Sequence, residues 1–179
     1  MVGMAMRQAK VVRAERFELV DVKGRMVAAW GSTPLGQHAL VFYDEAGKKR
    51  ALLSVDADGS PGLGLFDKAG EVRAMLSILA NGRPSLSLWD ENGQPRVTLG
   101  AGVLRLSQTD LVECPESSLM LFGETGTAWA DLCVFPGGTP GLSFHDEAGK
   151  ARVGLWLDAD GTPNLNLWGK DDEVLWEAP

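Results

Sequence analysis

One spacing constrains this chain more than any other feature of its sequence: alternating apolar segments end at aspartate or glycine every 23 residues. These markers are Asp21, Asp44, Asp67, Asp90, Gly123, Asp146 and Gly169. Only the interval from Asp90 to Gly123 is longer, by an insertion of ten residues. Glycine also recurs three positions after six of the markers and eight positions before five of them. A period of this length indicates a tandem array of one small supersecondary unit.

Each unit contains two turn signatures with strand-like segments between them. In Asp-x-x-Gly, the aspartate can accept hydrogen bonds from turn amides, and the glycine can take the positive φ that closes a hairpin. The second signature, as in residues 56–62, places a proline just before the next strand, where a missing donor costs little. Between the turns apolar residues alternate with period two and form one aliphatic side. The sequence therefore predicts an all-β antiparallel meander of about seven 23-residue hairpin repeats, with essentially no helix.

The other side of the predicted strands is also patterned, with an aromatic residue or histidine before most markers and arginine six positions after four of them. Suppose that the aliphatic residue two positions before the marker pairs with the one seven positions after it. The aromatic residue directly before the marker then pairs with the arginine six positions after it. Such aromatic–cation pairs contribute about 0.5–1 kcal/mol each at an exposed site. The expected pairs are Tyr43 with Arg50, Phe66 with Arg73, Trp89 with Arg96 and His145 with Arg152, while Phe122 faces Trp129.

Two ways of stacking the units differ in where they place the arginines. In a parallel β-solenoid, equivalent residues of successive coils lie about 4.8 Å apart, so the arginines would stack and repel. In a meander an aromatic side chain separates one arginine from the next. The pattern favours the meander, with the solenoid as the alternative.

The aliphatic side of the strands needs a cover, and two covers are open. The insertion, residues 100–118, could let the chain fold four units onto three as two packed sheets. Otherwise a second copy of the chain covers the face. The expected organisation is an N-terminal arm (1–16), four hairpin repeats (17–99), an irregular insertion (100–118) and three hairpin repeats (119–179).

Composition excludes several classes of protein. The formal charge of −7, with acids and bases interspersed, argues against a nucleic-acid groove, and no segment has the roughly 18 apolar residues of a membrane helix. Cys114 and Cys133 are too few for a disulfide framework. With no signal peptide visible in Met1–Arg16, we expect a cytoplasmic or phage- or particle-associated protein.

The unit consensus, L-x-L-aromatic-D-x-x-G-x-x-R-A-x-L followed by D-G-x-P-x, resembles tandem hairpin repeats of uncharacterised bacterial proteins. Its period and two-strand unit are similar to MORN repeats and to the YD repeats of Rhs-type proteins. The Y-x-G-x-W core of MORN repeats is absent from this chain. The resemblance covers residues 17–176, implies an extended β-meander and carries no catalytic residues.

The chain offers few candidates for catalysis. We call the position directly before the marker the aromatic slot, because most units have an aromatic residue there. His145 stands in this slot of its unit, and His38 stands at a position that elsewhere holds proline. Cys133 stands where other units have serine or tryptophan. The segments with the acidic pairs Asp56/Asp58 and Asp158/Asp160 begin with the D-x-D-G sequence of a calcium-binding loop. They lack the oxygen ligands that such a loop has further along, so the pairs are interpreted as turn residues. No enzyme, cofactor or metal site is expected; an active site, if one existed, would lie in the insertion.

The leading functional hypothesis is a non-catalytic structural or scaffolding protein that self-assembles or joins a larger particle, fibre or complex. The alternative is a carbohydrate- or protein-binding module that uses the aromatic and arginine face, because tryptophan and arginine are favoured in binding hot spots. The candidate ligand- or partner-binding residues are Tyr43, Phe66, Trp89, Phe122, His145, Trp168, Arg50, Arg73, Arg96 and Arg152.

Overall fold

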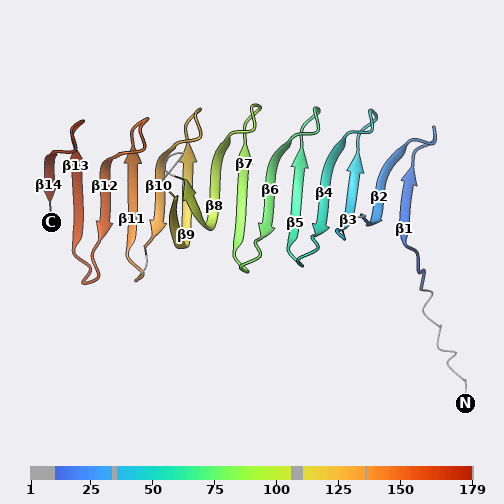
Figure 1. Ribbon diagram of the computed structural model, residues 1–179, viewed down its shortest axis with the longest axis horizontal. Helices are drawn as coiled ribbons and strands as arrows, with labels where there is room; N and C mark the ends of the chain where they lie inside the picture. Colours follow the sequence, from blue (N-terminus) through green and yellow to red (C-terminus); the bar gives the residue numbers. More distant parts are fainter. Residues whose placement is uncertain (1–10, 34–35, 106–110, 136, 179) are drawn as a thin grey trace, which may run out of the picture.

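The computed structural model describes residues 11–33, 36–105, 111–135 and 137–178. Of residues 101–116 it describes at most the backbone. The described residues form one sheet of fourteen antiparallel strands whose spatial order equals their sequence order (Figure 1). The strands are β1 (Arg16–Val20), β2 (Met26–Ser32), β3 (His38–Tyr43), β4 (Lys49–Val55), β5 (Pro61–Phe66), β6 (Val72–Ile78), β7 (Pro84–Trp89), β8 (Pro95–Arg105), β9 (Leu111–Phe122), β10 (Ala128–Val134), β11 (Pro140–His145), β12 (Ala151–Leu157), β13 (Pro163–Trp168) and β14 (Val174–Ala178). The predicted all-β meander of hairpin repeats is confirmed.

The marker turns all lie along one long edge of the sheet, the upper edge in Figure 1, which we call the marker edge. In the turn at Asp44, Gly47 N–H donates to the Asp44 carbonyl (3.0 Å) and Asp44 N–H donates to the Lys48 carbonyl (2.9 Å). Asp44 Oδ1 accepts hydrogen bonds from the amides of Ala46 and Lys48, both at 2.9 Å. Gly47 has φ 74°, which glycine adopts without strain. The turn chemistry expected from Asp-x-x-Gly therefore forms the hairpins.

A β-bulge follows every marker turn. Tyr43 pairs with Lys49 while Phe42 pairs with Ala51, so Arg50 is the extra residue on β4. The pairing of the aliphatic positions was predicted correctly, but the pairing of the aromatic slot with arginine is wrong. The same shift occurs in the hairpins β1/β2, β5/β6, β7/β8, β9/β10, β11/β12 and β13/β14.

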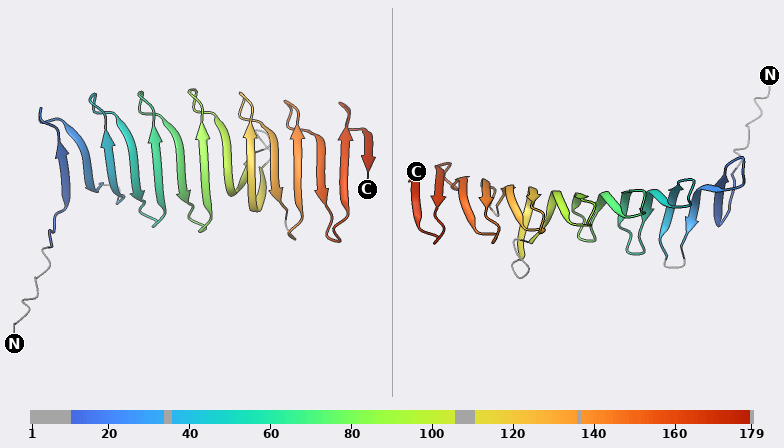
Figure 2. Two further views of the ribbon diagram at one scale, coloured as in Figure 1. Left: turned by 180° about the vertical axis from the view of Figure 1, so that it is seen from behind. Right: turned by 90° about the horizontal axis from the view of Figure 1, so that it is seen from above.

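The sheet is one layer deep. Over the described residues each strand pairs only with the strands before and after it in sequence, and no second layer is visible from above (Figure 2). The chain thus forms neither two packed sheets nor a solenoid. The strands also keep nearly one direction along the row (Figure 1), although sheets of many strands usually accumulate a marked twist. Flat sheets of this kind need stacking partners or side-chain ladders to stabilise them.

The insertion is not irregular over its described backbone. β8 and β9 are 11 and 12 residues long, and their extra length pairs from Gly102 with Cys114 to Arg105 with Leu111. Four units and three units therefore continue as one sheet through a longer hairpin. Gly100, at the register shift in this hairpin, has φ 133° and lies against Pro84 on β7.

The two faces of the sheet differ sharply in burial. We call them the leucine face, which carries the alternating aliphatic residues, and the aromatic face, which carries the aromatic slot. Buried strand residues of the aromatic face include Ala39, Ser54, Ser118, Met120, Asp131 and Cys133. On the leucine face, by contrast, Leu53, Leu76 and Leu132 are each about half exposed. Within one chain, the packed side of the sheet is therefore the polar and aromatic one.

Candidate functional site

The leucine face carries an unbroken row of leucines. The strand register places one leucine of every strand from β3 to β13 directly opposite the next. The members of this leucine ladder are Leu40, Leu53, Leu63, Leu76, Leu86, Leu99, Leu119, Leu132, Leu142, Leu155 and Leu165. A parallel row of Phe, Ala, Leu and Val, from Phe42 to Leu167, lies beside it.

The area of this surface is large for a single chain. Fourteen strands about 4.8 Å apart and about 20 Å long give each face about 1,200 Å². The largest apolar patch of a typical monomer covers only about 300–600 Å². The leucine face is therefore larger than the apolar patch that a typical monomer exposes.

The aromatic face is packed by rings that lie on glycines. A Cβ added to Gly64 would come within 3.0 Å of the Phe66 ring, and one added to Gly141 would come within 2.4 Å of Phe135. Glycine and serine under the rings thus let the aromatic side chains lie against the backbone. The described aromatic-slot residues Tyr43, Phe66, Trp89, Phe122 and Trp168 are all half-buried. One cation–π contact joins neighbouring units, with Lys49 Nζ 4.0 Å from the centre of the Phe66 ring.

The four candidate arginines bind the marker turns instead of the aromatic rings. Because each is the extra residue of a bulge, its side chain is redirected toward the marker edge. The guanidinium–carboxylate distances are 3.8 Å for Arg50–Asp44, 2.5 Å for Arg73–Asp67, 2.6 Å for Arg96–Asp90 and 2.6 Å for Arg152–Asp146. The arginines therefore pair with the marker carboxylates, and a binding role for the aromatic and arginine residues stays a prediction.

Two of these arginines also reach the next unit. Arg73 donates hydrogen bonds to the carbonyls of Asp90 and, at 3.1 Å, Glu91. Arg152 donates to the Gly169 carbonyl and forms an ion pair with Asp172 at 3.0 Å. The hydrogen bond from Arg152, followed by the Lys150 amide, lowers the pKa of Asp146. Arg73 and Arg152 thus form a side-chain ladder that ties their own marker turns to the next ones.

The sequence held a signal for this ladder. Arginine at the bulge occurs in the units whose marker is Asp44, Asp67, Asp90 or Asp146, and in no unit whose marker is glycine. In the first unit the bulge residue is Val27, and Arg25 pairs with Asp21 instead. After Gly123 the bulge residue is Trp129, and a Cβ on Gly123 would lie 2.4 Å from its Nε1. Where the marker is glycine, arginine is lost from the bulge as well, which indicates that aspartate and arginine are partners. Phe122 and Trp168 keep the aromatic slot filled in these two units.

His145, which stands in the aromatic slot of its unit, forms a buried polar pair with Asp131. Its Nε2 lies 2.7 Å from Asp131 Oδ2 on β10, and the two side chains are 8% and 7% exposed. Equivalent positions to Asp131 hold Leu52 and Met75 in other units. The pair therefore replaces an aromatic–aliphatic contact inside the packed aromatic face.

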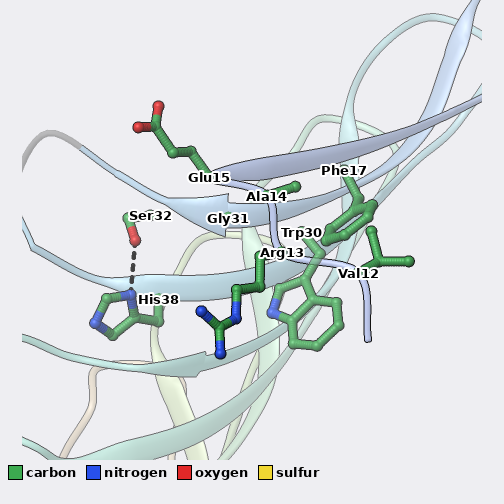
Figure 3. A pocket seen from close by; sticks show the side chains of 9 residues that line it. All are labelled: Val12, Arg13, Ala14, Glu15, Phe17, Trp30, Gly31, Ser32 and His38. Atoms are coloured by element: carbon green, nitrogen blue, oxygen red, sulfur yellow. Dashed lines mark hydrogen bonds between the residues drawn. The ribbon is translucent and has the colours of Figure 1, made fainter. Parts of the chain in front are cut away.

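A hollow of about 690 Å³ lies at the β1 end of the leucine face (Figure 3). Phe17 and Trp30 line it with ring centres 6.1 Å apart, and Ser32 Oγ lies 2.8 Å from His38 Nδ1. A serine–histidine pair needs a third group that orients the imidazole before it resembles a nucleophilic site. Glu15, the carboxylate in the lining, points away from His38 (Figure 3), so the hollow lacks that arrangement.

In the described part of the chain, no group of three or more His, Cys, Asp or Glu side chains could hold a metal ion. No helix in that part is long and apolar enough to cross a membrane. In comparisons with known proteins, the chain matches no protein-family model and no curated protein.

Proposed function

We propose that this protein is a structural building block that self-assembles by packing the leucine faces of two copies together. The observation that carries the proposal is the leucine ladder, which crosses the sheet and has no cover within the described chain. Two copies that share this face would bury about 2,400 Å² in total, which is in the range of obligate interfaces.

The shape of the sheet suits this contact. A strongly twisted sheet could pack against another over only part of its length, whereas a sheet whose strands keep one direction offers its whole face. Leucine side chains from two such faces can interdigitate as in a β-sandwich, with the sheets about 10 Å apart.

The open edges of the sheet favour face-to-face packing over end-to-end growth. If β14 of one copy continued the meander into β1 of another with the register of β4 and β5, Glu177 would stand directly opposite Glu18. Like charges in that position are destabilising, and charged residues are a common guard on sheet edges.

The test is the mass of the protein in solution, measured by sedimentation or light scattering over a range of concentrations. We expect a dimer or larger assembly for the wild type. The variant Leu76→Asn/Leu86→Asn should shift to monomer while it keeps its β circular dichroism. The matched control is Ser87→Asn, because Asn166 shows that the aromatic face accepts asparagine at that repeat position. A monomeric wild type, or an assembly unchanged by the leucine substitutions, would refute the proposal.

A further inference from the structure

The unit formed by β12 and β13 departs from the other units at three neighbouring positions of the aromatic face. Trp156 stands where other units have Ser54, Ser77 or Cys133. Asn164 replaces Gly62, Ser85 or Gly141, and Asn166 replaces Gly64, Ser87 or Ser143. The register places Trp156 opposite Asn164, with Gly154 opposite Asn166, so the three departures form one cluster. The repeat architecture does not need them, because no other unit has tryptophan or asparagine at these positions.

Two tryptophans form the centre of this cluster. The rings of Trp156 and Trp168 are nearly parallel, at 8°, with centres 6.4 Å apart. A Cβ on Gly154 would come within 3.1 Å of both rings, so both lie over this glycine. Both side chains are half-buried and leave part of their surface open on the aromatic face.

Polar groups hold and flank the rings. Trp156 Nε1 donates a hydrogen bond to Asp158 Oδ1 (3.1 Å), and Asn164 Nδ2 donates to Asp158 Oδ2 (2.9 Å). Asp158 thereby fixes the orientation of the Trp156 indole and of the Asn164 amide. Asn166 adds a second half-buried amide beside the rings. Asn164 Nδ2 also donates to the Thr162 carbonyl (3.2 Å), so its side-chain oxygen is the group that it offers to a ligand. The cluster thus combines a preorganised apolar plate with this acceptor and the Asn166 amide.

This combination fits the chemistry of a sugar chain. A pyranose has an apolar C–H face that stacks on an indole, and hydroxyl groups around its rim that pair with amides and carboxylates. The charged group in direct contact with the cluster is Asp158. Arg152, which reaches the Gly169 carbonyl beside Trp168, is paired with Asp146 and Asp172, and the whole chain carries −7. This charge distribution disfavours a phosphate-bearing or otherwise anionic ligand, and the indole plate with its amides favours a neutral glycan as the occupant.

We propose that the aromatic face of β12 and β13 binds a neutral glycan chain, with Trp156 and Trp168 as the stacking plate and Asn164 and Asn166 as the polar contacts. This site lies on the opposite face from the leucine ladder. An assembly through leucine faces would therefore leave one glycan site open on each outer surface, and several sites would increase the avidity for a polymeric ligand.

The experiment titrates the full-length protein with cellohexaose, xylohexaose, chitohexaose and maltohexaose, with calorimetry and tryptophan fluorescence as readouts. We expect at least one hexasaccharide to bind. Trp156→Ser, which restores the residue of Ser54 and Ser77, should weaken binding at least tenfold, and Asn166→Ser should weaken it several-fold. Trp89→Phe, which copies Phe66 in another unit, is the matched control and should leave binding unchanged.

Two results would overturn the inference: a wild type that binds none of the four glycans, or a Trp156→Ser variant that binds as tightly as the wild type. Neither result depends on assembly. A monomer that binds glycan would refute the proposed function alone, and an assembly that binds none would refute the glycan site alone.

Discussion

His145 Nε2 lies 2.7 Å from Asp131 Oδ2, and this pair is enclosed by the aromatic face on adjacent strands β10 and β11. Removing one member would leave the other polar group buried without its partner. Such a loss costs about 3–5 kcal/mol, whereas replacing both members by apolar residues can be neutral. Replacing both members should therefore lower the free energy of unfolding less than replacing one.

The variant His145→Phe copies the aromatic slot of Phe66, and we expect it to lower the free energy of unfolding by about 3 kcal/mol. Adding Asp131→Leu, the residue found at Leu52, should recover most of that loss. Urea unfolding of the wild type, both single variants and the double variant measures the coupling energy. Equal stability of His145→Phe and the wild type would contradict the prediction.

The ladder of marker aspartates predicts a pH dependence of stability. The pKa of Asp146 is lowered from 3.8, first by the hydrogen bond from Arg152. The pKa values of Asp21 and Asp90 are also lowered, first by the backbone amides of Arg25 and Gln94. A carboxylate with a lowered pKa in the folded state stabilises the fold above its unfolded pKa, and this stabilisation is lost as pH falls through the folded value.

We therefore expect the urea midpoint to be steady above the unfolded pKa of aspartate, about 3.9, and to fall progressively as the pH drops below it toward the lowered folded values. Asp146→Asn should lower the midpoint at neutral pH and reduce its dependence on pH at the acid end. Glu147→Gln changes an exposed residue of the same turn and serves as the control. All measurements need one protein concentration, because assembly would itself shift the apparent stability.

Gly100 marks the point where the longer hairpin of β8 and β9 leaves the regular repeat. A Cβ there would lie 2.2 Å from the Pro84 carbonyl oxygen, and φ is 133°, outside the region that other residues tolerate. We expect Gly100→Ala to lower the free energy of unfolding by about 2–4 kcal/mol. Gly82→Ala is the control: its φ of 80° is also positive, but a Cβ there meets no atom within 4 Å, so about 1 kcal/mol is expected.

The sequence was sufficient to predict the hairpins because the repeat, the Asp-x-x-Gly turns and the period-two alternation all agree. It also predicted the pairing of Phe42 with Ala51. The arginine partners were wrong because pairing was counted along a ladder without bulges. One extra residue, Arg50 in its unit, moves the side chain from the Tyr43 position to Asp44.

The burial of the two faces could not be read from hydrophobicity. Leucine and phenylalanine normally indicate the covered side of a strand. Here the side that is covered within the chain is that of Gly64 and Ser54, because aromatic rings such as Phe66 need small neighbours to lie flat. The stacked pair of Trp156 and Trp168 could not be predicted for a related reason: Trp168 fills the aromatic slot, while Trp156 stands at a position where other units have serine.

The open edges of the sheet give the last prediction. Glu18 on β1 and Glu177 on β14 would face each other if copies joined end to end in the register of β4 and β5, while Leu19 and Trp176 would form a favourable apolar pair. Reversing one charge with Glu177→Lys replaces the repulsion by attraction across the new strand pair. We expect larger end-to-end assemblies in sedimentation at low salt, weakened as salt screens the exposed pair. Glu147→Lys makes the same charge change in a turn and should leave the size unchanged; equal sizes for the two variants would show that the edge glutamates do not control growth of the sheet.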